Sequence, residues 1–198
     1  MADVLLFHHA LGLTPEVVWF ADALRAAGHT VTTPDLYEGR TFDDLDAGIA
    51  HAGELGFDEV RAAGVKAADD LPEGLVYIGM SLGVMPAQEL AQKRAGAAGA
   101  VFISSFVALG YFGDEWPAGV PVQVHGMDAD PIFAGEGDLE AAQALVASGA
   151  DAHLYLYAGD AHLLVQAEPP VDDIASFEVL DATLRFLGEI DSAAASAD

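Results

Sequence analysis

The sequence predicts an α/β protein in which a mostly parallel central sheet carries helices on both of its faces. Short apolar runs alternate with longer amphipathic segments along the 198 residues, and strands joined by helical crossovers pair in parallel. The run at residues 75–78 is apolar throughout, as in a strand buried on both faces. The length suits one domain. We place this domain at residues 1–190, without a large lid domain, and expect a flexible C-terminal tail at residues 191–198.

The order of the elements follows from apolar periodicity and from residues that begin or end helices. Thr14 and Pro15 begin a first helix that Gly28 ends. Gly56 divides the segment 41–70 into two acidic helices. The remaining helices are predicted at residues 84–93, 139–148 and 174–190, and the strands at residues 4–8, 29–33, 75–78, 100–104, 120–125 and 152–157.

The composition excludes several classes of function. Hydrophobic residues make up 53% of the chain and the mean hydropathy is +0.32, yet no apolar run reaches the ~18 residues of a membrane span. Seven Lys and Arg against 32 Asp and Glu give a formal net charge of −25, which opposes binding to nucleic acid or anionic membranes. The chain has no cysteine, so thiol chemistry is excluded. Because the N-terminus lacks the basic region of a signal peptide, we expect a cytoplasmic protein. We also expect a monomer or homodimer that needs no cofactor.

The segment Leu75–Gly83 predicts a nucleophile elbow. Its apolar strand runs directly into Gly79-x-Ser81-x-Gly83, and a predicted helix follows at once. Gly79 and Gly83 lack the β-carbons that would crowd the strand against the helix. Ser81 can therefore occupy a strained apex with its hydroxyl above the sheet, where a base and a substrate can reach it together.

Two further strand ends carry groups that could complete such a site. The fifth predicted strand leads to Asp128 and Asp130, and the sixth leads to His162. The carboxyl ends of parallel strands meet at one edge of a sheet, where ligands bind. Serine, aspartate and histidine follow one another in the chain order of the α/β-hydrolases. We expect Asp130 to orient His162, because Pro131 biases Asp130 to an extended conformation, and we expect Asp128 to form the turn.

Five motifs give the sequence a resemblance to a known family. They are His9-Ala10-Leu11-Gly12-Leu13, Pro34-Asp35-Leu36-Tyr37, Gly79-Met80-Ser81-Leu82-Gly83, His125-Gly126 with the aspartates after it, and Tyr157-Ala158-Gly159-Asp160-Ala161-His162. With these motifs the sequence resembles the dienelactone hydrolase family of α/β-hydrolases over nearly its whole length. The resemblance implies a nucleophile at position 81, a histidine base at 162 and an acid in the loop 128–130, acting on esters or lactones. The Asp-Pro pair in this loop also resembles the family's pattern.

The sequence departs from the family's pattern at three places. Typical members carry cysteine where this chain has Ser81, and a glutamate where it has His9. They also use an arginine shortly after the catalytic histidine to hold a substrate carboxylate, whereas Leu163, Leu164, Val165 and Gln166 follow the histidine here. The missing arginine and the net charge of −25 argue against anionic dienelactones as substrates.

The expected roles follow the chemistry of acyl transfer. His162 takes the proton of Ser81 and later returns it to the leaving group, while the N–H groups of Leu82 and Ala10 form the oxyanion hole. Residues that could line a substrate pocket, and that could equally be core or loop packing, are His9, Tyr37, Phe106, Phe112, Trp116 and Phe133.

Three functions remain open from the residues alone. The leading hypothesis is a serine hydrolase that cleaves a small ester or lactone through an acyl-enzyme. The alternative is a catalytically idle fold that binds a small ligand or a partner protein, since fold does not fix function. The third is metal-assisted hydrolysis through His8, His9 and Asp35. We expect no metal site, because adjacent strand side chains such as His8 and His9 point to opposite faces.

Overall fold

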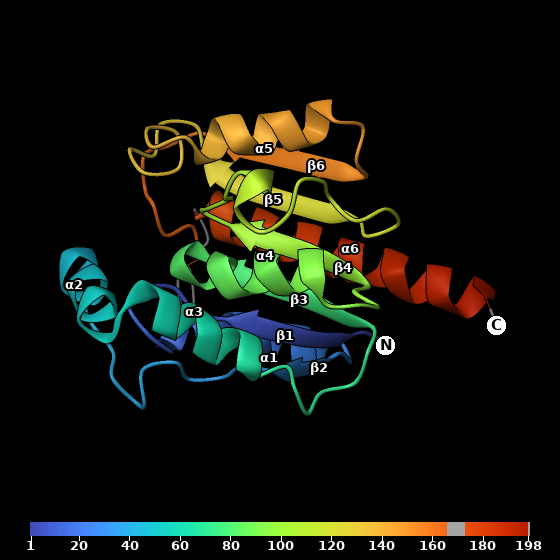
Figure 1. The fold of residues 1–198 in the computed structure, drawn as a ribbon, viewed down its shortest axis with the longest axis horizontal. Helices are drawn as coiled ribbons and strands as arrows, with labels where there is room; N and C mark the ends of the chain where they lie inside the picture. Colours follow the sequence, from blue (N-terminus) through green and yellow to red (C-terminus); the bar gives the residue numbers. More distant parts are fainter. Residues whose placement is uncertain (166–172, 198) are drawn as a thin grey trace.

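Six parallel strands form one twisted sheet in the order β2-β1-β3-β4-β5-β6 (Figure 1). The computed structural model describes residues 1–165 and 173–197. The strands are β1 (Asp3–Phe7), β2 (Thr30–Thr32), β3 (Leu75–Met80), β4 (Gly99–Ile103), β5 (Val122–Met127) and β6 (Ala152–Tyr157). All pairings are parallel, so the carboxyl ends of the six strands lie along one edge of the sheet.

The helices cover both faces of this sheet, as the sequence predicts. Helices α1 (Pro15–Ala26) and α6 (Ile174–Ala197) pack on one face, while α4 (Val84–Lys93) and α5 (Asp138–Ala147) pack on the other. Helices α2 (Leu45–Leu55) and α3 (Phe57–Lys66) follow β2, and α3 packs against α4. Two short 3₁₀ turns, η1 (Ser81–Gly83) and η2 (Leu109–Tyr111), complete the elements. The described residues contain no large additional domain.

Side chains of the central strands alternate between the two apolar layers. Leu6 of β1 and Ile78 of β3 belong to the cluster that contains α1 and α6. Their neighbours Phe7 and Tyr77 belong to the cluster that contains α4 and α5. Successive strand residues point to opposite faces. Because both faces are covered, β3 and β4 are buried throughout, which explains why their sequences are continuous apolar runs.

Helix α6 is longer than the sequence predicts. It continues to Ala197, so residues 191–197 are helical, where we expected a frayed tail, and its last turns project beyond the sheet (Figure 1). Alanines in this segment favour the helix, and the carboxylate of Asp191 lies 2.8 Å from the N-terminal ammonium of Met1. The helix does not continue the apolar face, which is why periodicity alone ends it at Ile190. Neither α6 nor any other helix of the described residues has the length and apolarity to cross a bilayer.

Candidate active site

The turn after β3 has the geometry of a nucleophile elbow. Ser81 adopts a φ of 46°, a left-handed conformation that is strained for a residue with a side chain. A β-carbon at Gly79 would lie 2.5 Å from the carbonyl oxygen of Gly83, and one at Gly83 would lie 2.5 Å from the carbonyl oxygen of Phe7. Real side chains do not approach this closely. The two glycines therefore allow α4 to start directly beneath Ser81 and against the end of β1.

Ser81, His162 and Asp130 form one hydrogen-bonded chain. The Oγ of Ser81 lies 2.7 Å from Nε2 of His162, and Nδ1 of His162 lies 2.8 Å from Oδ2 of Asp130. The second carboxylate oxygen of Asp130 accepts the N–H of Ile132 at 2.9 Å. Asp130 is fully buried, so its carboxylate is held in place between a backbone donor and the imidazole.

Asp128 has a different task in the same loop. Its Oδ1 accepts the N–H of Gly159 at 3.1 Å, and its own N–H donates to the carbonyl of Tyr157 at 2.9 Å. Asp128 thus ties the loop after β5 to the loop after β6. The structure places Asp130, and not Asp128, against the imidazole.

This arrangement can move a proton from the serine to the imidazole. A carboxylate accepts the Nδ1–H of His162, which leaves Nε2 as the acceptor that faces the hydroxyl of Ser81. A hydroxyl in this position can lose its proton to Nε2 as its oxygen attacks an electrophile. The charge that develops on the imidazole would face Asp130.

Two backbone N–H groups lie where an oxyanion could be held. Leu82 is the second residue of η1, at the start of a helical turn, where N–H groups have no partner within the turn. Ala10 lies in the loop after β1 and is buried. Its N–H donates to no other residue among those that the structure describes. Both N–H groups are therefore available for a ligand, and their role as an oxyanion hole stays a prediction.

His9 is a buried and neutral neighbour of this site. It is 2% exposed, and burial, with His8 and His162 nearby, lowers its pKa to about 4 although the carboxylate of Glu16 opposes the shift. Its Nδ1 accepts the N–H of Leu11 at 3.3 Å. His9 lines a small hollow beside Ser81, together with Met80, Ile103, Ser104, Leu163, Leu164 and Val165.

Ser104 is a residue of this hollow that the sequence analysis missed. It follows β4, has a φ of 64° and is 1% exposed. Its hydroxyl has no hydrogen-bond partner among the described residues. The signal that could have found it is its position at the carboxyl end of a central strand, next to the strand that carries Ser81.

None of the aromatic residues considered for a substrate pocket lines the hollow beside Ser81. Tyr37 is buried and packs edge-on against the rings of His8 and His51. Phe133 is fully buried and packs against Gly126. Phe106 and Phe112 are also buried. These residues pack in the protein interior. Core or loop packing is the second role that the sequence analysis allowed for them.

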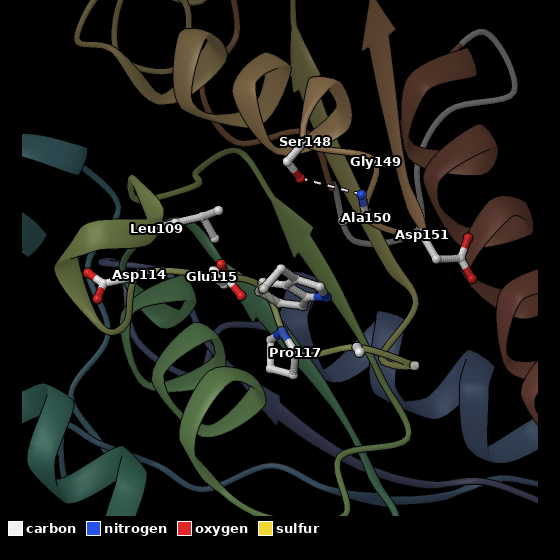
Figure 2. A pocket seen from close by; sticks show the side chains of 11 residues that line it. Leu109, Asp114, Glu115, Pro117, Ser148, Gly149, Ala150 and Asp151 are labelled. Atoms are coloured by element: carbon white, nitrogen blue, oxygen red, sulfur yellow. Dashed lines mark hydrogen bonds between the residues drawn. The ribbon is translucent and has the colours of Figure 1, made fainter.

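Trp116 lies at the opposite edge of the sheet. Its ring packs against Phe102, its Nε1–H donates to the carbonyl of Val120 at 2.6 Å, and it lines a cavity before the first residues of β5 and β6 (Figure 2). Because the strands are parallel, this edge is the one farthest from Ser81. Of the six residues that the sequence offers for a pocket, only His9 lines the hollow beside Ser81.

His8 and Asp35, which were considered as metal ligands, accept hydrogen bonds from backbone N–H groups instead. Nε2 of His8 accepts the N–H of Leu36 at 3.0 Å, and the carboxylate of Asp35 accepts the N–H groups of Tyr37 and Gly39 at 2.9 and 2.6 Å. Among the described residues, no three His, Asp or Glu side chains are grouped so that they could hold a metal ion. His8 and Asp35 therefore order the loop after β2.

Comparisons with solved structures agree with this fold. Among solved structures, a dienelactone hydrolase-like promiscuous phosphotriesterase from metagenomic libraries superposes with a TM-score of 0.71 at 18% identity, over 96% of this chain and 87% of that one. The esterase PE8 gives a TM-score of 0.65 at 19% identity, over 96% and 92%. A thermophilic esterase from Thermogutta terrifontis with propionate bound gives 0.59 at 16% identity, over 96% and 83%.

Sequence comparison reaches the same family. A search of curated protein sequences found no match. The family model of the dienelactone hydrolase family matches residues 2–191, which is nearly the whole chain. The protein belongs to the dienelactone hydrolase family.

Proposed function

We propose that this protein is a serine hydrolase that cleaves a small carboxylic ester or lactone through an acyl-enzyme. The observation that carries the proposal is the chain of hydrogen bonds from Ser81 through His162 to Asp130, at 2.7 and 2.8 Å. Membership of the family and the esterases among the similar structures support hydrolysis of an ester. In this proposal, Asp130 orients the imidazole of His162, and Ser81 is the nucleophile.

The first half of the proposed reaction forms the acyl-enzyme. The Oγ of Ser81 attacks the ester carbonyl carbon while Nε2 of His162 accepts its proton, and the N–H groups of Ala10 and Leu82 stabilise the resulting oxyanion. The tetrahedral intermediate collapses when His162 returns the proton to the leaving alcohol oxygen. The acyl group then remains on Ser81.

The second half repeats these steps with water. His162 accepts a proton from a water molecule whose oxygen attacks the acyl carbon, and the new intermediate releases Ser81 as the leaving group, which regains its proton from the imidazole. The carboxylic acid product departs. A lactone follows the same route, except that the alcohol formed in the first half stays joined to the acyl group through the carbon chain, so that the second half releases a single hydroxy acid.

The test combines labelling with kinetics. A fluorophosphonate should label Ser81, which peptide mass spectrometry locates, and p-nitrophenyl butyrate should be hydrolysed in a reaction that iodoacetamide does not inhibit. Ser81→Ala should lower kcat by roughly 10⁴-fold, leaving the rate that oxyanion stabilisation and binding provide. A loss below about tenfold would show that another residue is the nucleophile.

The same experiment separates the proposed enzyme from the alternatives. A folded protein whose Ser81 stays unlabelled and which turns over no ester would be the idle, ligand-binding fold. Turnover that survives Ser81→Ala and that a chelator abolishes would indicate metal-assisted hydrolysis instead.

A further inference from the structure

A second cavity adjoins the hollow beside Ser81 and is large enough for a substrate substituent. Its volume is about 400 Å³, which falls within the range of roughly 300–1,000 Å³ for small-molecule sites. The residues that line it come from the loop after β1, the start of α1, the segment before α2 and the loop after β6; they are His9, Leu11, Thr14, Pro15, Glu16, Thr41, Phe42, Asp43, Leu163 and Val165.

Three residues line both this cavity and the hollow beside Ser81. They are His9, Leu163 and Val165. Leu163 directly follows His162 in the chain. The cavity therefore lies directly beside the hollow, where a substituent of a substrate held at Ser81 would reach it past His9 and Leu163.

The walls of the cavity are held by the backbone. The N–H of Phe42 donates to the carbonyl of Leu11 at 3.0 Å, which fixes the segment before α2 against the loop after β1. Gly12, at a φ of 89°, packs so closely on the carbonyl oxygen of Arg40 that a β-carbon would collide with it. The cavity is thus part of the folded structure and does not depend on a side chain closing over it.

The charges in this cavity are of one sign. Glu16 and Asp43 are its only charged lining residues among those that the structure describes. Glu16 is half-buried in the first turn of α1 and lies close enough to influence His9, whose imidazole is neutral. Arg40 is exposed and touches the wall through its backbone. The remaining contacts are apolar side chains and two threonines.

We propose that this cavity binds the acyl substituent of the substrate, and that Glu16 and Asp43 make the enzyme prefer neutral or cationic esters over anionic ones. The inference rests on the proposed function, because it takes Ser81 as the point where the carbonyl lies. A carboxylate in the cavity would be repelled by the half-buried Glu16 and by the exposed Asp43, whereas an uncharged group would not be repelled and an ammonium group would be attracted. The preference would come from these two side chains and not from the overall charge of the protein.

Three p-nitrophenyl esters with matched six-carbon acyl chains test this preference. Their chains end in a carboxylate (the adipate half-ester), in its methyl ester, or in a trimethylammonium group. At low ionic strength kcat/KM for the methyl ester should exceed that for the carboxylate by about tenfold, and about 0.5 M salt should reduce the difference. The cationic ester should be cleaved at least as well as the neutral one.

Two double variants separate the local effect from the overall charge. Glu16→Gln with Asp43→Asn should reduce the neutral-to-anionic ratio to about threefold or less. Asp114→Asn with Glu115→Gln removes the same two charges from the cavity at the far edge of the sheet, where Figure 2 shows both side chains. This second variant should keep the wild-type ratio. A wild-type ratio near one, or an equal change in both variants, would overturn the inference.

Binding to the Ser81→Ala variant distinguishes failure of this inference from failure of the proposed function. Dissociation constants for the three esters should show the same order as kcat/KM. The same order of binding in a protein that never turns over an ester would refute the proposed hydrolase and leave the charge preference of the cavity intact. Equal dissociation constants would refute the preference, even if Ser81 proves to be the nucleophile.

Discussion

Asp130 and Asp128 are two residues apart and hold different partners. The side chain of Asp130 is buried against the imidazole of His162, whereas Asp128 joins two loops through backbone groups. Losing the orienting carboxylate favours the wrong tautomer of the imidazole, so Asp130→Asn should lower kcat by roughly 10⁴-fold. Asp128→Asn should keep most of kcat and cost about 1 kcal/mol of unfolding free energy. Kinetics on p-nitrophenyl butyrate and urea titrations measure both, and the reverse pattern of kcat losses would assign the orienting role to Asp128.

Ser104 combines two unfavourable features. Its φ of 64° costs about 1–2 kcal/mol relative to glycine, and its buried hydroxyl lacks a partner among the described residues, which costs about 1–3 kcal/mol. Ser104→Gly removes both features and should raise the free energy of unfolding by about 1 kcal/mol, after allowing for the entropy of glycine. Ser104→Ala, which keeps the strain, is the matched comparison in the same urea titration. A loss of stability in both variants would mean that the hydroxyl does have a partner in solution.

The turn between β3 and α4 requires glycine at position 83, because α4 begins close to the end of β1. A β-carbon at Gly83 would lie 2.5 and 2.6 Å from the carbonyl oxygens of Phe7 and His8, so Gly83→Ala must push α4 away from the end of β1. We expect it to cost about 2–4 kcal/mol of unfolding free energy, as overpacking does. Gly188→Ala in α6 is the control, because nothing lies within 4 Å of that β-carbon; it should stabilise by about 1 kcal/mol. Equal effects of the two substitutions would show that close packing is not the reason for Gly83.

The regular elements could be predicted because each leaves a signal in neighbouring residues. The apolar run of β3, Pro15 at the start of α1 and Gly56 between α2 and α3 all act locally. The ends of β3, β5 and β6 then place Ser81, Asp130 and His162 on one edge, because parallel strands allow no other arrangement. The order of the strands thus brings these three side chains into contact, while their catalytic roles stay a prediction.

The residues around the cavity proposed for the substrate could not be predicted in the same way. Tyr37, Trp116 and Phe133 have the composition expected of pocket residues, but a buried aromatic ring has the same sequence signal whether it faces a ligand or the core. The cavity that adjoins Ser81 is formed by three loops and one helix start that are distant in the chain. Residues such as Glu16 and Asp43 come together only through backbone contacts like that of Phe42 with Leu11, which no local pattern encodes.

At the scale of the whole molecule, buried histidines link stability to pH. Burial lowers the pKa of His125 to about 3 and that of His9 to about 4, against about 6.5 in the unfolded chain. Below pH ~6.5 the unfolded state therefore binds protons that the folded state does not. Their contribution to stability is complete above pH ~6.5 and is lost as the pH falls toward the folded-state values, by about 1.4 kcal/mol per pH unit for each histidine.

His125→Gln tests this linkage, because it removes one of these histidines and leaves the acidic surface unchanged. Urea titrations between pH 6.5 and 4.5 should show a smaller fall in unfolding free energy for the variant, by about 1.4 kcal/mol per pH unit relative to wild type. The comparison cancels the contribution of the carboxylates, which is common to both proteins. Parallel slopes would show that His125 becomes protonated in the folded state at the same pH as in the unfolded chain.

The hydrogen-bonded chain at the site joins parts of the sequence that are far apart. Ser81 and His162 are 81 residues apart, and His162 and Asp130 are 32 residues apart. Their meeting requires β3, β4, β5 and β6 to pair in order, and such non-local pairing is a slow part of folding. After dilution from urea, ester cleavage should therefore return only once this half of the sheet has formed. The helical circular dichroism signal should recover earlier. The return of turnover would then report the last stage of refolding.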